Sequence, residues 1–396
     1  MATTARVDFA RPGSIRFEVL PPLSLYVHIP WCVRKCPYCD FNSHEPSGEL
    51  PEQDYCSALI ADLEQALPEI WGRRVYSVFF GGGTPSLFSP SSIDRLLSAF
   101  RAQLQLASDA EITLEANPGT FEAAKFRDFR AAGVNRLSIG VQSFDDAKLA
   151  ALGRIHAGDE ARRAIEHARG YFEQVNVDLM YGLPDQSVDG AGKDVAEAVR
   201  LGVPHISAYQ LTIEPNTVFY SKPPLLPAHD EAAEMQEALE AVLAEAGYGH
   251  YETSAFARPG ARCRHNLNYW QFGDYLGIGA GAHGKLSFPG RIERHTRAKQ
   301  PRAYMSLAST GASIIERREL GVKELPFEFM LNALRLLEGF PPELFRSRTG
   351  LALRSIEAPL AAAEARGLIE RDHRSIRPTL RGQRFLNDLL ELFLPA

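Results

Sequence analysis

Six short apolar runs, rich in β-branched and aromatic residues, alternate with amphipathic stretches over the first half of the chain. The runs cover residues 24–29, 75–80, 111–116, 135–141, 174–180 and 205–213, and the amphipathic stretches cover residues 52–67, 91–105, 121–132, 158–172 and 190–201. A strand followed by a helix every roughly 30–40 residues is typical of parallel β/α units. Because six units are two fewer than a closed barrel needs, the pattern predicts an α/β fold built on a partial (β/α)6 barrel.

The remainder of the chain predicts a change of architecture. Residues 229–246 have a strongly helical pattern that ends at Gly247, a residue type that suits a helix C-terminus. Further on, three helical stretches precede a short β-wing and a last helix, an order like that of winged-helix modules. These segments are predicted at 326–337, 341–348, 353–366, 367–378 and 380–394. We therefore divide the chain into a lead-in (1–20), a barrel (21–250), an extension (251–320) and a small, mainly helical C-terminal domain (321–396).

Composition and charge exclude several classes of protein. The 396 residues carry a net charge of -6, so no general attraction to nucleic acid or to membrane surfaces is indicated. Three of the five cysteines are clustered and two are isolated, which suits a reducing compartment better than a disulfide framework. No stretch approaches the roughly 18 apolar residues of a membrane span, and the first twenty residues contain no apolar signal core. We therefore expect a cytoplasmic protein.

The cysteine cluster is the strongest chemical feature of the chain. Cys32, Cys36 and Cys39 follow the first apolar run and a Pro30-Trp31 break, so the spacing C-x3-C-x2-C falls on a loop. A loop can direct successive thiolates toward one centre, and thiolates are the ligands of iron–sulfur clusters. Three thiolates on a four-iron cluster leave one iron without a protein ligand. The alternatives are a disulfide with one odd thiol, and a zinc site completed by His28 or His44.

Polar, glycine and proline residues stand at the carboxyl end of each of the other five predicted strands. In parallel β/α folds, binding and catalytic sites gather at these ends. We therefore expect the five segments to meet at one mouth, beside the cysteines. They are Gly81–Pro85, Glu115–Pro118, Gln142-Ser143, Asp178–Pro184 and, closing the sixth run, Tyr209-Gln210 with Glu214-Pro215.

With Tyr38 just before the third cysteine, the cysteine motif resembles the signature of the radical S-adenosylmethionine (SAM) superfamily. This resemblance implies a [4Fe-4S] cluster whose open iron is chelated by the amino and carboxylate groups of SAM. SAM needs close backbone approach, a cation for its carboxylate and acids for its ribose hydroxyls. The residues predicted to bind it are Tyr26, Gly82, Gly83, Thr84, Glu115, Gln142, Arg154 and Asp178. All except Gln142 also have a structural explanation: a tight turn for the glycine-rich segment with Thr84, helix capping for the carboxylates, a surface charge for Arg154 and core packing for Tyr26.

A closer resemblance extends from about residue 23 to the C-terminus, and it is to the oxygen-independent coproporphyrinogen-III oxidase group. The oxidase branch of that group has a long N-terminal extension and a further cysteine just after the third cluster ligand. Here 31 residues precede Cys32, and Asp40-Phe41 follow Cys39, so the resemblance favours the other branch, the heme chaperones. The segments that carry the resemblance are Tyr26–Phe41, Gly81–Pro85, Glu115–Pro118, Gly140–Phe144, Leu152–His156 and Val177–Gln186.

The heme chaperone branch is marked by a His-Asn-x-x-Tyr-Trp motif, which this chain has at His265, Asn266, Tyr269 and Trp270. The resemblance associates this motif with heme. A histidine with neighbouring aromatic residues can ligate iron while the rings cover the porphyrin. The structural alternative is a turn whose histidine and asparagine bond backbone groups and whose rings pack. Weaker candidates for heme iron are Cys263 and His283, whereas Cys56 is expected in the core.

The resemblance thus implies a heme chaperone that carries a [4Fe-4S] cluster, SAM and heme and delivers heme to hemoproteins, without coproporphyrinogen dehydrogenase activity. The alternative is an oxygen-independent coproporphyrinogen-III oxidase of porphyrin biosynthesis, which would use the same cluster and SAM site. No catalytic residue is indicated by the sequence, and no nucleic-acid partner is expected, because basic and acidic residues are nearly balanced in the C-terminal domain. A homodimer and a transient contact with a membrane protein are left open.

Overall fold

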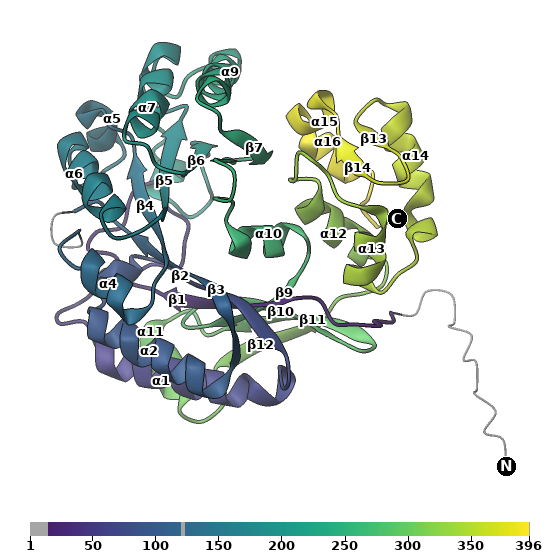
Figure 1. The fold of residues 1–396 in the computed structure, drawn as a ribbon, viewed down its shortest axis with the longest axis horizontal. Helices are drawn as coiled ribbons and strands as arrows, with labels where there is room; N and C mark the ends of the chain where they lie inside the picture. Colours follow the sequence, from purple (N-terminus) through teal and green to yellow (C-terminus); the bar gives the residue numbers. More distant parts are fainter. Residues whose placement is uncertain (1–14, 120–122, 396) are drawn as a thin grey trace.

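The computed structural model describes residues 15–119 and 123–395, and its centre is one twelve-stranded sheet (Figure 1). The strands lie in the order β12-β11-β10-β9-β1-β2-β3-β4-β5-β6-β8-β7. Six consecutive strands, β1 to β6, pair in parallel in chain order, which confirms the predicted series of parallel β/α units. Their bounds are Leu23–Ile29, Arg74–Gly82, Gln105–Ala116, Arg136–Gln142, Gln174–Tyr181 and His205–Gln210.

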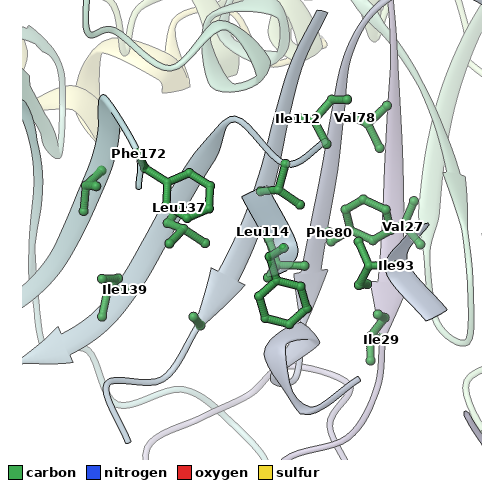
Figure 2. Close-up of a cluster of buried hydrophobic side chains, with 14 of the residues drawn as sticks. Val27, Ile29, Val78, Phe80, Ile93, Ile112, Leu114, Leu137, Ile139 and Phe172 are labelled. Carbon is green, nitrogen blue, oxygen red and sulfur yellow. The ribbon is translucent and has the colours of Figure 1, made fainter. Parts of the chain in front are cut away.

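Each of these strands presents alternate residues to two different surroundings. On β1, Leu25, Val27 and Ile29 are buried against helices, while Tyr26 and His28 point to the opposite, concave face. Figure 2 shows the apolar rows of four neighbouring strands side by side, with Val27 and Ile29 on β1, Val78 and Phe80 on β2, Ile112 and Leu114 on β3, and Leu137 and Ile139 on β4. Burial of these rows stabilises the sheet by about 25 cal/mol per Å2 of apolar surface. The concave face is therefore left for polar residues.

Helices cover the convex face of the parallel strands (Figure 1). They are α1 (Glu52–Ala66), α2 (Pro90–Gln103), α4 (Phe126–Ala132), α6 (Gly158–Arg169), α7 (Val188–Arg200) and α9 (His229–Glu245). All six overlap predicted helical stretches, although residues 121 and 122 of one stretch lie outside the described residues. Gly247 adopts a left-handed φ of 80° just after α9, as expected for a helix C-terminus. In the described part of the chain, no helix is long and apolar enough to cross a membrane.

The segment after α9 extends the sheet at both edges. Beyond β6 lie β8 (Ala255–Ala257) and β7 (Gly249–Glu252), both antiparallel to their neighbours. On the other side, β9 (Asp274–Ile278) pairs in parallel with β1 and is followed by the antiparallel strands β10 (His283–Phe288), β11 (Arg291–Arg297) and β12 (Ile314–Glu319). Helix α10 (Arg264–Trp270) connects β8 to β9, so it passes from one edge of the parallel strands to the other (Figure 1).

The C-terminal residues form a separate lobe with its own apolar core (Figure 1). It contains α12 (Leu325–Ala333), α13 (Pro342–Thr349), α14 (Glu357–Ala365) and a hairpin of β13 (Ile369–Arg371) and β14 (Ile376–Pro378), which confirms the predicted wing. The prediction of one last helix is wrong. Phe385 leaves the helical conformation and separates α15 (Leu380–Arg384) from α16 (Leu386–Glu391), because the change of direction buries Leu389 and Leu390 in the core of the lobe.

The C-terminal lobe is fixed to the barrel by main-chain hydrogen bonds at the free edge of β7. The amide of Thr253 donates to the carbonyl of Arg335 over 3.0 Å, and the amide of Leu337 donates to the carbonyl of Tyr251 over 3.2 Å. Leu336, between them, forms a β-bridge with Glu252. The backbone of residue 335 is therefore held at the rim of the barrel.

Candidate functional site

The carboxyl ends of β1 to β6 surround a pocket of about 750 Å3, which we call the mouth pocket. All three clustered cysteines line it, and so do seven of the eight residues predicted to bind SAM: Gly82, Gly83, Thr84, Glu115, Gln142, Arg154 and Asp178. Segments far apart in the sequence meet here because parallel strands all end at the same side of the sheet. The eighth residue, Tyr26, does not line this pocket.

The cysteine loop, residues 30–44, closes one side of the mouth pocket. The amide of Cys32 donates to the carbonyl of His44, and the amide of His44 donates to that of Pro30, so both ends of the loop are paired. The Nζ of Lys35 donates to the carbonyls of Phe41 and Ser43 and places a positive charge inside the loop. The three thiols are partly exposed toward the pocket, and burial raises the pKa of Cys32 and Cys39 above the ordinary value.

Both histidines that could complete a zinc site are committed to other partners. His28 receives a hydrogen bond at Nδ1 from the Tyr26 hydroxyl (3.1 Å) and donates from Nε2 to the carbonyl of Asn42 (2.9 Å). The ring of His44 is bonded to the side-chain oxygen of Asn42 (3.3 Å). Burial lowers the pKa of His28 to about 4, so this ring is neutral and serves to fasten the loop. These contacts favour the cluster over the zinc alternative.

Asn42 joins the cysteine loop to the glycine-rich turn between β9 and β10. Its amide nitrogen donates to the carbonyls of Ala280 and Lys299, both over 2.9 Å. A side chain at Gly281 would lie 2.3 Å from that nitrogen, and the residue has a left-handed φ of 79°. The turn therefore needs glycine to admit Asn42. The exposed His283, a weaker heme candidate, lies just beyond this turn.

The glycine segment after β2 lies directly against the cysteine loop. The amides of Gly83 and Thr84 donate to the carbonyls of Ile29 and Trp31. A Cβ atom at Gly83 would lie 2.5 Å from the oxygen of Trp31, so only glycine allows this approach. The hydroxyl of Thr84 lies 3.6 Å from the sulfur of Cys32. The glycines are thus explained both by this close approach and by access to the pocket.

Two carboxyl groups line the mouth pocket close enough for the charge of one to act on the other. Glu115 accepts a hydrogen bond from the amide of Gly82 (3.2 Å), and burial together with the charge of Asp178 raises its pKa to about 8. Asp178 accepts from Ser138 (3.0 Å) and Asn176 (2.7 Å), and burial raises its pKa as well. Neither carboxyl caps a helix here, and both line the mouth pocket.

Arg154 connects the cysteine loop to the ends of β3 and β4. It donates to the side-chain oxygen of Asn117 (2.9 Å) and to the carbonyl of Gly140 (2.7 Å), and its Nη1 lies 3.6 Å from the sulfur of Cys36. Its Nε has no hydrogen-bond partner among the described residues. Arg154 is therefore a half-buried cation that lines the mouth pocket and not an exposed surface charge. Nearby, Gln142 has a left-handed φ of 70° and accepts a hydrogen bond from the hydroxyl of Tyr209.

The predicted heme motif forms helix α10, which lies toward the other end of the parallel strands. His265 is buried, and its Nδ1 lies 3.0 Å from the hydroxyl oxygen of Ser77 on β2. Ser77 precedes Gly82 by five residues, which is roughly 16 Å along a strand. The ring of His265 packs against Phe79 and, at 6.5 Å between centroids, against Tyr26. Tyr26 therefore lies between the cysteine loop and α10, deeper than the mouth pocket.

The other members of the motif are half-buried on α10. Tyr269 packs on Tyr275 (4.9 Å), Trp270 lies under the guanidinium of Arg335 (4.3 Å), and Asn266 is half-buried in the first turn of the helix. Cys263, which precedes the helix, is a buried thiol 3.5 Å from Glu111, and burial raises its pKa to about 12. Burial also lowers the pKa of His265 to about 3, so its imidazole is neutral. Cys56 is buried in α1, as predicted.

Several residues of the mouth pocket were not among the predicted site residues. Ser138 alternates with the apolar row of β4, so the period of two contained a signal for it, whereas Tyr209 and Gln210 were expected at the mouth and do line it. Arg34 lies within the cysteine motif itself. Arg335 comes from the C-terminal lobe, and no local pattern marks it.

Comparison with known families gives two matches along the chain. Residues 26–197 match the radical SAM superfamily, and residues 320–385 match the HemN C-terminal domain. The chain is 52% identical over 377 residues to the heme chaperone HemW of Escherichia coli, covering 95% of this chain and 99% of that protein. It is 48% identical over 381 residues to the heme chaperone HemW of Haemophilus influenzae, covering 95% and 98% respectively.

A mouse protein, the mitochondrial radical S-adenosyl methionine domain-containing protein 1, is 39% identical over 391 residues, covering 94% of this chain and 87% of that protein. Among solved structures, the coproporphyrinogen III oxidase HemN of Escherichia coli superposes with a TM-score of 0.80 at 24% identity, covering 94% of this chain and 90% of that one. This structural likeness establishes the fold of both the barrel and the C-terminal lobe.

Proposed function

The chain belongs to the HemW family of the radical SAM superfamily, and from this premise we propose that it is a heme chaperone. In this proposal it holds a [4Fe-4S] cluster on Cys32, Cys36 and Cys39, binds SAM in the mouth pocket and binds heme at α10. It then delivers the heme to a hemoprotein. The observation that carries the proposal is the joint presence of a thiol-lined mouth pocket and the motif-bearing helix in one barrel.

The residues of the mouth pocket fit the two cofactors by their chemistry. Three thiols on one loop, with the cations Lys35 and Arg154 at their side, suit a cluster because positive charge favours thiolates. When bound, the cluster supplies a single electron and an open iron. The protein itself contributes the glycine backbone for close approach, Arg154 for a carboxylate, and Glu115 with Asp178 for hydroxyl groups.

Heme binding is supported by the character of α10. The helix presents aromatic rings beside a neutral histidine, and a neutral imidazole is the form that ligates iron. Because Nδ1 of His265 is bonded to Ser77, the other ring nitrogen is the one left to bind iron. Ligation through His265 would require α10 to move or its neighbours to open, since the side chain is buried.

The second candidate function is oxygen-independent coproporphyrinogen-III oxidation, and the observation that favours it is the shared fold with HemN. Against it, Asp40-Phe41 follow Cys39, and Phe41 is 60% exposed. Anaerobic incubation of the reconstituted protein with coproporphyrinogen III, SAM and a reductant separates the two functions. We expect no protoporphyrinogen, and its accumulation would overturn the chaperone proposal.

Anaerobic heme titration of the purified protein tests the proposal directly. We expect a Soret shift that saturates at a fixed stoichiometry with wild-type protein and changes its position in His265→Ala. If neither the wild type nor His265→Ala gives a Soret shift, α10 is not a heme site. Transfer of the bound heme to an apo-hemoprotein, followed by its spectrum, tests the chaperone step.

A further inference from the structure

Arg335 is the one residue that connects the C-terminal lobe, the mouth pocket and the predicted heme motif in the described part of the chain. It lines the mouth pocket, and its guanidinium carbon lies 4.3 Å above the ring of Trp270. Its backbone is fixed because its carbonyl accepts from the amide of Thr253 at the edge of β7. The side chain therefore reaches from a rigid position toward both sites.

Arg335 and Trp270 each have a hydrogen-bond donor that the described part of the chain leaves without an acceptor. Among the described residues, neither Nε of Arg335 nor Nε1 of Trp270 has a hydrogen-bond partner, although both atoms are buried. The only ion pair of the guanidinium in that part of the chain is a long contact of 3.5 Å with Glu252. A buried donor without a partner costs free energy unless a ligand supplies the acceptor.

The chemistry of the missing acceptor can be deduced from the donors. A guanidinium has a planar fork of N–H groups that matches a carboxylate, and an indole N–H adds one more donor beside it. The guanidinium stacks on the ring of Trp270, which holds the fork beside the indole N–H. A ligand that suits these donors carries a carboxylate, and the paired rings of Tyr269 and Trp270 suit an apolar aromatic body beside it.

We propose that Arg335 and Trp270 bind a propionate carboxylate of heme and thereby orient the porphyrin between α10 and the mouth pocket. The inference rests on the proposed function, because it presumes that heme is the cargo. It adds a residue of the C-terminal lobe to the heme site, and so it makes the docking of that lobe necessary for recognition. The carboxylate of SAM is the other source of the same chemistry, and the experiment distinguishes the two.

The test compares heme with heme dimethyl ester, whose propionates are esterified. Wild-type protein should bind heme about 10- to 100-fold more tightly than the ester, as expected for a charge-assisted hydrogen bond. Arg335→Gln should bind the two with nearly equal affinity, while its affinity for the ester and for SAM stays unchanged. Trp270→Phe keeps a ring below Arg335 but loses the N–H. Its preference for heme over the ester should be about 3- to 10-fold smaller than that of wild-type protein.

Arg262→Gln is the matched control. Arg262 also joins the barrel to the C-terminal lobe, through Glu338, but it is 41% exposed and does not line the mouth pocket. It should retain the full preference for heme. Thermal melting of each variant, and Arg335→Lys as a variant that keeps the charge, identify any loss caused by unfolding.

The outcomes separate the inference from the proposed function. If wild-type protein binds no heme, the chaperone function fails and this inference fails with it. If wild-type protein prefers heme to its ester and folded Arg335→Gln does so equally, the inference alone is overturned. A loss of SAM affinity in Arg335→Gln with intact heme discrimination would also overturn it, by assigning the pair to the carboxylate of SAM.

Discussion

Nδ1 of His265 lies 3.0 Å from the hydroxyl oxygen of Ser77, so the predicted heme motif is fastened to the inside of β2 and not to the mouth of the barrel. The amide of His265 also donates to Glu111 on β3 (3.0 Å). These two contacts orient α10 across the opening between the sheet edges. They also place the histidine in surroundings that exclude its charged form.

The buried His265 makes the stability of the protein sensitive to acid. Burial lowers its pKa from 6.5 to about 3. The unfolded chain therefore binds a proton at this histidine below pH 6.5, whereas the folded chain binds it only below about pH 3. Stability is therefore complete above pH 6.5 and falls as the pH drops between these values, by about 1.4 kcal/mol per pH unit for this group. In urea unfolding at pH 7, 6 and 5, the free energy of unfolding of His265→Gln should fall less steeply than that of the wild type, by about 1.4 kcal/mol per pH unit.

His28 and His156 provide the comparison, because burial lowers the pKa of each to about 4. They should continue to destabilise the His265→Gln variant at low pH. Equal slopes for the variant and the wild type would show that His265 is not buried as a neutral ring.

Glu115 is expected to lower the stability of the cofactor-free protein while contributing to ligand binding. Its pKa is raised from 4.5 to about 8 by burial and by Asp178, so the folded state favours the protonated form and loses stability as the pH rises from 4.5 to 8. Glu115→Gln removes this penalty and should stabilise the cofactor-free protein by about 3 kcal/mol at pH 7. If Glu115 binds a ribose hydroxyl, the same variant should bind SAM more weakly in equilibrium dialysis.

Glu111 supplies a control on the same strand. It is buried as well, but it pairs with Arg136 (3.6 Å) and accepts from the amide of His265. Glu111→Gln should therefore destabilise the protein, since it breaks a buried ion pair. If Glu115→Gln also destabilises the cofactor-free protein at pH 7, the carboxyl is not held in a costly position.

Asn42 should determine how firmly the cysteine loop retains a cluster. Asn42→Ala removes the hydrogen bonds to Ala280 and Lys299 and should cost about 1–3 kcal/mol of stability. Loss of visible absorbance after addition of a chelator should be faster than in wild-type protein. Gln236→Ala, a variant on α9 away from the loop, should lose its cluster at the wild-type rate. Equal rates for all three would contradict the anchoring role.

The alternation of apolar and polar residues was sufficient to predict the parallel strands, because Leu25, Val27 and Ile29 pack outward and their neighbours do not. It was also sufficient to predict that Gly82, Glu115 and Asp178 lie at one pocket, since the carboxyl ends of the strands meet at one side of this fold. The pattern could not predict β9 beside β1, because that pairing joins segments about 250 residues apart and depends on tertiary contact.

Two features of the site depended on tertiary packing that the motifs do not encode. Tyr26 stays a prediction for the SAM site, and the structure adds that its hydroxyl bonds His28 and that its ring lies beside His265. Arg335 reaches Trp270 only because the C-terminal lobe docks on the edge of β7. A motif indicates residue types at a spacing, whereas these contacts result from how two distant segments pack.

Arg154 should matter for both cofactors, because it joins their predicted sites. Its guanidinium contacts Asn117, Gly140 and the sulfur of Cys36. Arg154→Gln removes the cation and should weaken SAM binding by about 10- to 100-fold, as for the loss of charged hydrogen bonds. Arg154→Lys restores the charge without the planar fork and should recover only part of the affinity.

Arg162 provides the control for charge alone, since it pairs with Asp159 and Glu197 on the outer face of the barrel. Arg162→Gln should leave SAM binding unchanged. Calorimetric titration of reconstituted protein measures the affinities, and iron content per chain shows whether the cluster is intact in each variant. Wild-type SAM affinity in a fully reconstituted Arg154→Gln variant would show that the guanidinium only braces the strand ends. Weak SAM binding with normal iron content is the result that would place it at the ligand.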